Sequence, residues 1–373
     1  MREKIIHSVE LIRKGEKFAL MYDTEDGYYN TFSGGKDSQA LYHIVKMAGV
    51  KFKTHMSLTS VDPGDVIRFV KNEYPSVVRH KPKMSMFQAA VEHKILPTMR
   101  VRWCCADFKE SAGAGKVTLI GIRAEESTRR AKRHEVEVSN KNFSGNIDEF
   151  EQWSEKEIEK KRLKLKRKLN EDEFTVKTDN EIRCINGKDS ILVSPIFQWT
   201  ERDVWYFLDN IIHAPHCSLY DEGYTRIGCI LCPMSTYKSK LRDVERFPHV
   251  KRGWIKAIKA IRRGGYFTAR ISGGTSPSKA ASDCNQEEDY YGTTNPQYVI
   301  TGRTMQQIFP FRSPSELWGN RPGFSNRPAS GGVDAGQWSE DEIAEAIFDW
   351  WISGKPYKKW YNDRYIQQHF NFE

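Results

Sequence analysis

A hexapeptide near the N-terminus, SGGKDS at residues 33–38, carries the residue types best suited to chemistry. Its two glycines let backbone N–H groups approach a ligand, and a helix that starts there adds unpaired N–H donors and a positive dipole end. Lys36 contributes a full positive charge, while Ser33 and Ser38 contribute hydroxyl groups. The combination predicts an anion-binding site, with Lys36 and Asp37 as the candidate catalytic residues.

A tight turn between a strand and a helix would also use two glycines. Such a turn does not explain why lysine, aspartate and serine follow the glycines directly. The hexapeptide is not a Walker A loop, because that loop needs a longer glycine spacing. A second glycine cluster, residues 113–116, also fails the Walker pattern, since Glu110 stands where its first glycine belongs. We therefore expect residues 113–116 to form an ordinary turn before a strand.

Five of the seven cysteines are grouped in a way that suits a metal centre. The seven are Cys104, Cys105, Cys184, Cys217, Cys229, Cys232 and Cys284. Cys229 and Cys232 form a C-x-x-C pair, which places two thiolates on one metal ion or cluster. Four thiolates suit zinc as well as an iron–sulfur cluster, and unligated buried thiols are a third alternative. Cys184 and Cys284 lie outside the group and are expected to be unligated.

Strand-forming runs alternate with amphipathic helices around these residues. Strands are expected at 28–32, 52–58, 117–122 and 190–197, and helices at 4–16, 40–48, 65–74, 201–210 and 251–262. The hexapeptide 33–38 therefore lies between a buried strand and a helix. Short apolar strands that alternate with helices predict an α/β fold with a largely parallel sheet.

A charged helical insertion interrupts this alternation at residues 136–180. Its helix is expected at 154–169, and seven of the nine residues from 160 to 168 are basic. Such a helix serves either as a solvated surface or as a nucleic-acid contact, and its sequence leaves both interpretations open.

A second irregular segment follows the last α/β elements. Residues 264–338 are rich in glycine, serine, proline and asparagine, which predicts loops. A final helix is expected to begin at Ser339 and to end at Gly354. The expected domains are therefore 1–262 and a loop-rich C-terminal extension, 263–373, that ends in a helix.

Composition and charge narrow the classes of partner. The 373 residues include 39% hydrophobic and 29% charged side chains, as in folded globular proteins. A net charge of +9 favours an anionic substrate or a polyanionic partner. The apolar runs are too short to span a membrane, and the charged N-terminal segment lacks the apolar core of a secretory signal. A cytoplasmic protein with reduced thiols and no membrane partner is therefore expected.

SGGKDS between a strand and a helix resembles the signature of the PP-loop superfamily, whose members hold the phosphates of ATP or the phosphosulfate of an adenylylated sulfate. Residues 121–127, 195–205 and 220–233 are similar to segments of the phosphoadenosine phosphosulfate (PAPS) reductase-like family. The resemblance implies an adenine nucleotide α-hydrolase-like (PP-loop) fold that binds ATP or PAPS with Mg²⁺. The nucleotide-binding residues that it implies are Ser33, Gly34, Gly35, Lys36, Asp37, Ser38, Gly121, Arg123 and Ser127.

The cysteine arrangement resembles that of the iron–sulfur type of adenylyl-sulfate reductase. In those enzymes a tandem cysteine pair and a downstream C-x-x-C hold a [4Fe–4S] cluster. Here five thiols are available for four positions. The expected ligands are Cys105, Cys217, Cys229 and Cys232, with Cys104 as the alternative to Cys105 and zinc as the alternative metal.

The chain departs from the assimilatory sulfonucleotide reductases at its C-terminal side. Those enzymes attack the substrate sulfur with a cysteine in a Glu-Cys-Gly-Leu-His-like peptide, whereas no cysteine follows Cys284 here. Relatives that lack the peptide include the sulfur-transfer component of DNA phosphorothioation and, more distantly, the PP-loop tRNA thiolases.

The expected function is therefore ATP-dependent sulfur transfer, by adenylylation and then thiolation, on DNA or RNA held through residues 160–168. A sulfur donor such as a cysteine desulfurase would be a partner. Two alternatives stay open. One is a PAPS or adenylyl-sulfate reductase that produces sulfite, and the other is a non-catalytic nucleotide-binding partner in a phage-defence or regulatory complex.

Overall fold

The computed structural model of the chain describes residues 1–110, 112–139, 141–166, 189–263, 339–355 and 359–360. Their contacts divide them into two compact units. The sheet unit comprises Met1–Lys83 and Trp103–Cys232, and the helical unit comprises Met84–Arg102 and Pro233–Glu373. Residues 167–180 of the predicted insertion, residues 181–188 after it, and the predicted loops at 264–338 lie outside the described residues. The predicted domain limits, 1–262 and 263–373, stay a prediction.

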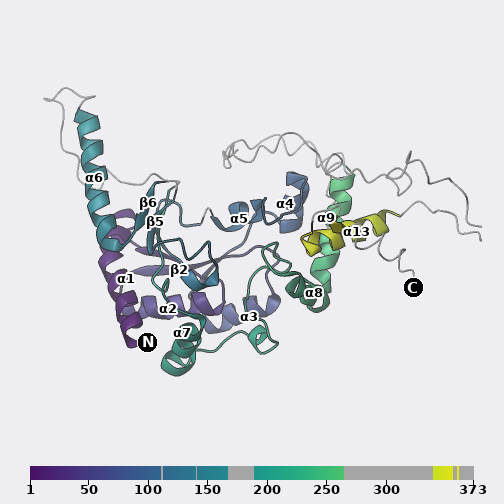
Figure 1. Cartoon of the computed structure of the whole chain (residues 1–373), viewed down its shortest axis with the longest axis horizontal. Helices are drawn as coiled ribbons and strands as arrows, with labels where there is room; N and C mark the ends of the chain where they lie inside the picture. Colours follow the sequence, from purple (N-terminus) through teal and green to yellow (C-terminus); the bar gives the residue numbers. More distant parts are fainter. Residues whose placement is uncertain (111, 140, 167–188, 264–338, 356–358, 361–373) are drawn as a thin grey trace, which may run out of the picture. The chain divides into compact units, whose positions relative to one another are not determined.

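The sheet unit contains a seven-stranded sheet in the order β3-β2-β1-β4-β7-β5-β6. Figure 1 labels strands β2, β5 and β6 of this sheet. Its strands are β1 (Tyr28–Thr31), β2 (Phe52–Ser57), β3 (Val78–His80), β4 (Val117–Leu119), β5 (Val136–Val138), β6 (Phe143–Gly145) and β7 (Ile191–Val193). Strands β1, β2, β3, β4 and β7 run parallel, whereas β5 is antiparallel to both β6 and β7. The predicted α/β fold with a largely parallel sheet is confirmed.

The direction in which strands are added changes between β1 and β4. From β1 the chain continues outward through β2 and β3, and it then returns to place β4 on the other side of β1. Open α/β sheets bind ligands outside the carboxyl ends of their strands at such a point. Residues 33–38 follow β1 and residues 121–127 follow β4, so both segments border it.

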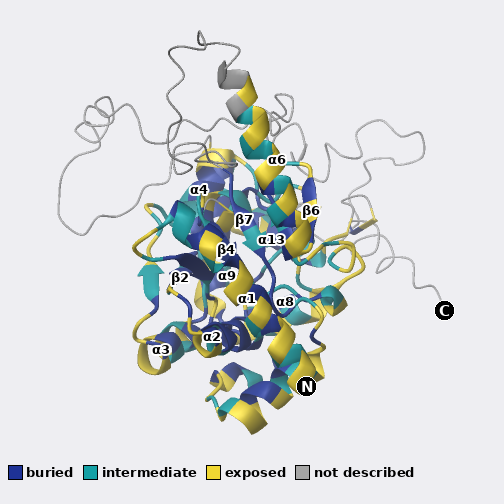
Figure 2. Cartoon of the chain, turned by 90° about the vertical axis from the view of Figure 1, so that its left-hand side faces the viewer, coloured by how far each residue is buried: buried dark blue, intermediate teal, exposed yellow. Residues whose placement is uncertain are grey.

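Helices connect and cover these strands. Those of the sheet unit are α1 (Arg2–Tyr22), α2 (Lys36–Ala48), α3 (Gly64–Glu73), α5 (Trp103–Cys105), α6 (Ile147–Lys166) and α7 (Glu201–Tyr206). Helix α2 is largely buried (Figure 2), because Leu41, Ile44 and Val45 face the core. It ends at Gly49, whose φ of 69° forms a left-handed cap. It begins at Lys36, before the predicted start, so the lysine lies in the first turn.

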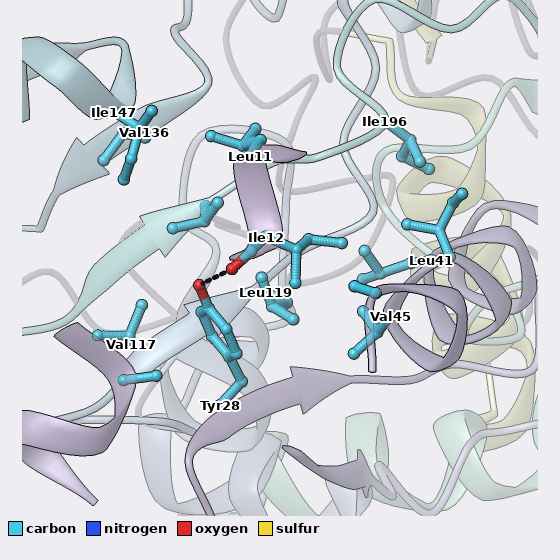
Figure 3. Packing of buried hydrophobic residues seen from close by; sticks show 14 of the residues in the cluster. Leu11, Ile12, Tyr28, Leu41, Val45, Val117, Leu119, Val136, Ile147 and Ile196 are labelled. Atoms are coloured by element: carbon cyan, nitrogen blue, oxygen red, sulfur yellow. Dashed lines mark hydrogen bonds between the residues drawn. The ribbon is translucent and has the colours of Figure 1, made fainter. Parts of the chain in front are cut away.

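A buried tyrosine on β1 joins the sheet to helix α1. Tyr28 is fully buried, and its hydroxyl donates a hydrogen bond of 2.8 Å to the carbonyl of Ile12 on α1 (Figure 3). Gly15 lies one turn later on α1, and a Cβ at this position would come within 2.4 Å of the Tyr28 hydroxyl oxygen. The contact therefore requires a glycine in the interior of a helix, where glycine is otherwise unfavourable.

Gly15→Ala is expected to destabilise the protein by about 1–3 kcal/mol, because the added methyl group overlaps the Tyr28 oxygen. The sign should reverse in a Tyr28→Phe background. There the obstructing oxygen is gone and the next atoms lie 3.6 Å away. Alanine then gains about 0.5–1 kcal/mol of helix stability over glycine. Chemical unfolding of the two single variants and the double variant measures the coupling, and additive changes would contradict the packing described here.

The predicted insertion begins differently from expectation. Strands β5 and β6 pair with each other, and β5 pairs with β7, so this part extends the main sheet. Helix α6 starts at Ile147, before the predicted start at Ser154, because the apolar Phe150 is fully buried against the core. The Asn146 side chain accepts a hydrogen bond from the Glu149 N–H and supports this earlier start.

The helical unit joins segments that are distant in sequence. Its helices are α4 (Met86–His93), α8 (Tyr237–Arg246), α9 (Pro248–Arg262) and α13 (Glu340–Ser353). Helix α13 begins with a capping box at Ser339 and ends at Gly354, which confirms the predicted bounds. It packs on α9 through Trp351 and Trp254, whose ring centroids are 4.8 Å apart. Within the described part of the chain, no helix combines the length and apolar character needed to cross a bilayer.

Candidate functional site

The segments after β1 and β4 pack directly on the start of α2. Gly34 has a φ of 76°, and a Cβ there would lie 2.7 Å from Val66 and 2.9 Å from Val70 of α3. A Cβ at Gly121 would lie 3.1 Å from the Asp37 carbonyl oxygen. Only glycine satisfies both the left-handed backbone and the close approach at Gly34. The structure therefore brings Gly121 against the predicted loop.

Two serines stabilise the loop from within. The Ser38 hydroxyl donates to the carbonyl of Gly35 at 2.8 Å and accepts from the Ser33 N–H at 3.2 Å. Ser38 is buried by these contacts, whereas Ser33 is exposed. Ser38 thus maintains the shape of the loop, and Ser33 is the serine that faces solvent.

Lys36 is only 4% exposed, and its ammonium already has partners. Its Nζ donates to the carbonyl of Thr225 at 2.8 Å. It also lies 3.2 Å from Glu201 and 3.8 Å from Asp37. The lysine is therefore positioned by contacts on both sides of the loop before any ligand is bound.

Arg123 is paired with carboxylates in this structure. Its Nε donates to Asp37 at 2.6 Å, and its Nη1 donates to Glu125 at 2.8 Å. Burial lowers the pKa of the Arg123 guanidinium, but the charge and hydrogen bond of Asp37, together with Glu126 and Glu125, outweigh burial and hold the pKa above its usual value. Ser127 lies at the exposed end of the same turn, where its hydroxyl accepts from the Arg130 N–H at 3.2 Å. Arg123 thus ties this turn to the loop.

Tyr220 is a site residue that the sequence did not identify. Its hydroxyl accepts a 2.8 Å hydrogen bond from the backbone N–H of Lys36, in the first turn of α2. The tyrosine belongs to the stretch 220–233, which the resemblance covers, but nothing in that stretch indicates which of its side chains reaches the loop.

Four thiols from two segments of the sheet unit lie near one another, and we call Cys104, Cys105, Cys229 and Cys232 the four-thiol cluster. A hydrogen bond with Cys105, together with burial, raises the pKa of the Cys104 thiol. The nearby Cys229 and Cys232 raise this pKa further. Lys109 donates a hydrogen bond to Cys229. Thiol sulfurs are the donors that zinc and iron–sulfur clusters take, so the cluster fits either group by its chemistry.

Cys217 has different surroundings. It is 1% exposed, and burial raises the pKa of its thiol, with smaller contributions from the carboxylates of Asp65, Glu222 and Asp221. Among the described residues, no three His, Cys, Asp or Glu side chains adopt a metal-holding arrangement. Metal binding and the final placement of ligands are coupled, so free thiols need not show the liganded geometry. The predicted set with Cys217 stays a prediction.

The sequence pattern of the phosphoadenosine phosphosulfate reductase domain matches residues 28–235. The adenosine 5'-phosphosulfate reductase of Oceanobacillus iheyensis is 27% identical over 177 residues, which cover 45% of this chain and 54% of the relative. An uncharacterized protein of Methanocaldococcus jannaschii is 34% identical over 74 residues, which cover 19% of this chain and 17% of the relative. The chain thus spans about half or less of these two curated relatives.

A solved structure is also similar to this chain, at lower sequence identity than these relatives. The crystal structure of the PAPS reductase from Candida auris, in a phosphate complex, aligns with 61% of this chain and 95% of that chain. The sequence identity is 15% and the TM-score is 0.35.

Proposed function

This chain belongs to the phosphoadenosine phosphosulfate reductase domain family, and from that premise we propose that residues 33–38 bind the phosphates of an adenine nucleotide. The observation that carries the proposal is the position of Lys36. Its ammonium and its backbone N–H both lie where the strand order changes. They follow Gly34, where a side chain would collide with α3. The reaction that we propose is the use of ATP to activate an oxygen atom for replacement by sulfur.

Both backbone N–H groups and side chains of residues 33–38 would contact the nucleotide. The N–H groups at the start of α2 bind phosphate oxygens, and Lys36 neutralises their charge. Asp37 is the carboxylate that would hold Mg²⁺, which takes carboxylate and phosphate oxygens. Arg123 keeps Asp37 in place through their 2.6 Å hydrogen bond. Lys36 and Asp37 are thus the proposed catalytic pair.

The four-thiol cluster is the proposed site of a [4Fe–4S] cluster, with zinc as the alternative. We place Cys104 and Cys105 in the set together with Cys229 and Cys232, since Cys105, Cys232 and Cys229 all raise the pKa of Cys104, whereas none of these thiols contributes to the pKa of Cys217. An iron–sulfur cluster, when bound, supplies electrons or sulfur to the transfer. The Lys109 ammonium would balance the negative charge of the thiolates.

A nucleic acid is the proposed sulfur acceptor. The net charge of +9 favours a polyanion, and the basic residues of 160–168 begin on α6 beyond the part that packs on the core. The segment of α6 around Lys160 is largely exposed (Figure 2). Each phosphate that such a helix contacts releases counterions, so affinity depends on salt.

Replacing Lys160, Lys161, Lys164 and Lys166 by Glu is expected to weaken binding of DNA or RNA without sequence preference. The slope of log K against log salt should fall by about 0.9 for each phosphate that the altered helix no longer contacts. A matched control reverses Lys46, Lys51, Lys71 and Lys81, which are exposed outside α6. Equal binding by the α6 variant and the parent at every salt concentration would show that α6 does not contact the nucleic acid.

Reduction of a small sulfonucleotide is the second candidate, favoured by the relative named adenosine 5'-phosphosulfate reductase. The deciding experiment measures pyrophosphate and AMP release from ATP, with and without DNA or RNA, beside thioredoxin-dependent sulfite release from PAPS. Nucleic-acid-stimulated release supports sulfur transfer, sulfite supports reduction, and binding without turnover supports a non-catalytic partner.

A further inference from the structure

The groups that a phosphate would need are already occupied within the protein. The Lys36 N–H donates to the Tyr220 hydroxyl, and the Lys36 ammonium donates to the Thr225 carbonyl, both at 2.8 Å. A Cβ placed on Gly35 would lie 3.4 Å from the Tyr220 oxygen, so this oxygen lies over the loop backbone. Tyr220 thus holds the position in which a ligand oxygen would accept from the first turn of α2.

The Tyr220 hydroxyl is a neutral acceptor that an anionic ligand could replace. Its ring packs edge-on against Trp205, with centroids 4.9 Å apart. Burial raises the pKa of Tyr220, so its oxygen is a neutral acceptor. Anionic phosphate oxygens form stronger hydrogen bonds than neutral oxygens do. A phosphate therefore outcompetes the phenol for the Lys36 N–H, although it must first break that contact.

The same chain segment leads from the loop to the four-thiol cluster. It contacts α2 at Pro215, whose carbonyl accepts from Gln39 at 2.7 Å, and then at Tyr220 and Thr225. Further along, the Ile230 N–H donates to the Val61 carbonyl at 2.8 Å, between the two cysteines of the C-x-x-C pair. A displacement at Tyr220 thus acts on a segment that ends in Cys229 and Cys232.

We infer that Tyr220 is a built-in competitor of the nucleotide phosphates, and that its displacement loosens residues 217–228 next to the C-x-x-C pair. The inference rests on the proposed binding of an adenine nucleotide by residues 33–38. It assigns to Tyr220 a positioning role, in which the phenol keeps the free site closed and links its occupation to the segment that carries the thiols.

Titration of Tyr220→Phe with ATP and Mg²⁺ tests the competition. Removing the hydroxyl removes one competing hydrogen bond, so the variant should bind about two- to tenfold more tightly than the parent. Tyr42→Phe is the matched control, because the Tyr42 hydroxyl lies on α2 but faces Ser76 at 3.4 Å. Its affinity should equal that of the parent. Binding by Tyr220→Phe that is unchanged or weaker overturns the inference.

Hydrogen exchange on the unaltered protein provides a second measurement that needs no variant. Amides of residues 217–228 should exchange faster when a non-hydrolysable ATP analogue is bound, and exchange that slows or stays the same contradicts the inference. If neither the parent nor Tyr220→Phe binds ATP or PAPS, the proposed function fails and the inference fails with it. If the parent binds and Tyr220→Phe binds no more tightly, the inference alone fails. Binding by the variant only would support it.

Discussion

Lys36→Met is expected to weaken binding of ATP by about 10- to 100-fold, since a hydrogen bond to a charged group contributes about 1.5–3 kcal/mol. Methionine keeps the length and apolar stem of the buried lysine but lacks the ammonium that would pair with phosphate. The change should leave α2 and the sheet intact, because the ammonium's partners in the free protein are the Thr225 carbonyl, the half-exposed Glu201 and Asp37, which keeps its hydrogen bond to Arg123. Calorimetric titration with ATP and with PAPS measures the loss of affinity.

Lys46→Met is the control for this variant. Lys46 lies at the opposite end of the same helix, is exposed, and places its ammonium 5.6 Å from the Tyr42 ring centroid. Its removal should leave nucleotide affinity unchanged. Unchanged affinity in Lys36→Met, with a normal unfolding transition, would refute the assignment of residues 33–38 as the phosphate site.

Cys229→Ser and Cys232→Ser are expected to lose most of the bound metal after anaerobic purification, and their melting temperature should fall, because metal binding adds to folding stability. The parent should carry about four irons per chain if it holds a [4Fe–4S] cluster, or about one zinc if it holds that metal. Iron and zinc analysis with an absorption spectrum distinguishes the two. Stoichiometric zinc without iron would remove the redox cluster from the proposed reaction.

A comparison of Cys104→Ser with Cys217→Ala decides between the two ligand sets. The four-thiol cluster predicts that Cys104→Ser loses metal and that Cys217→Ala retains it, because the other thiols contribute to the pKa of Cys104 but not to that of Cys217. The opposite pattern would restore the ligand set that the spacing alone favoured. Alanine is chosen at Cys217 because a serine hydroxyl there would be buried without an assured partner.

Local patterns in the sequence were sufficient for the elements around the loop. The β-prone run before residue 33, the apolar periodicity after it and the left-handed cap at Gly49 are all short-range features. The capping box at Ser339 and the stop at Gly354 are equally local, and they located α13 correctly. Strand β3 and the β5–β6 hairpin were not predicted, because these strands are only three residues long and, unlike β4 and β7, do not lie in longer apolar runs.

The contacts between segments were decided only by the tertiary structure. Spacing left five thiols for four positions, and only the folded chain shows that Cys229 and Cys232 lie close enough to Cys104 to raise its pKa. Sequence also placed Tyr220 184 residues from Lys36 with no sign that the two meet. Such contacts follow from the order in which strands join the sheet. The residue types that suit an anion site are therefore evident from the chain itself, whereas the groups that contact Lys36 become evident only when the strands are assembled.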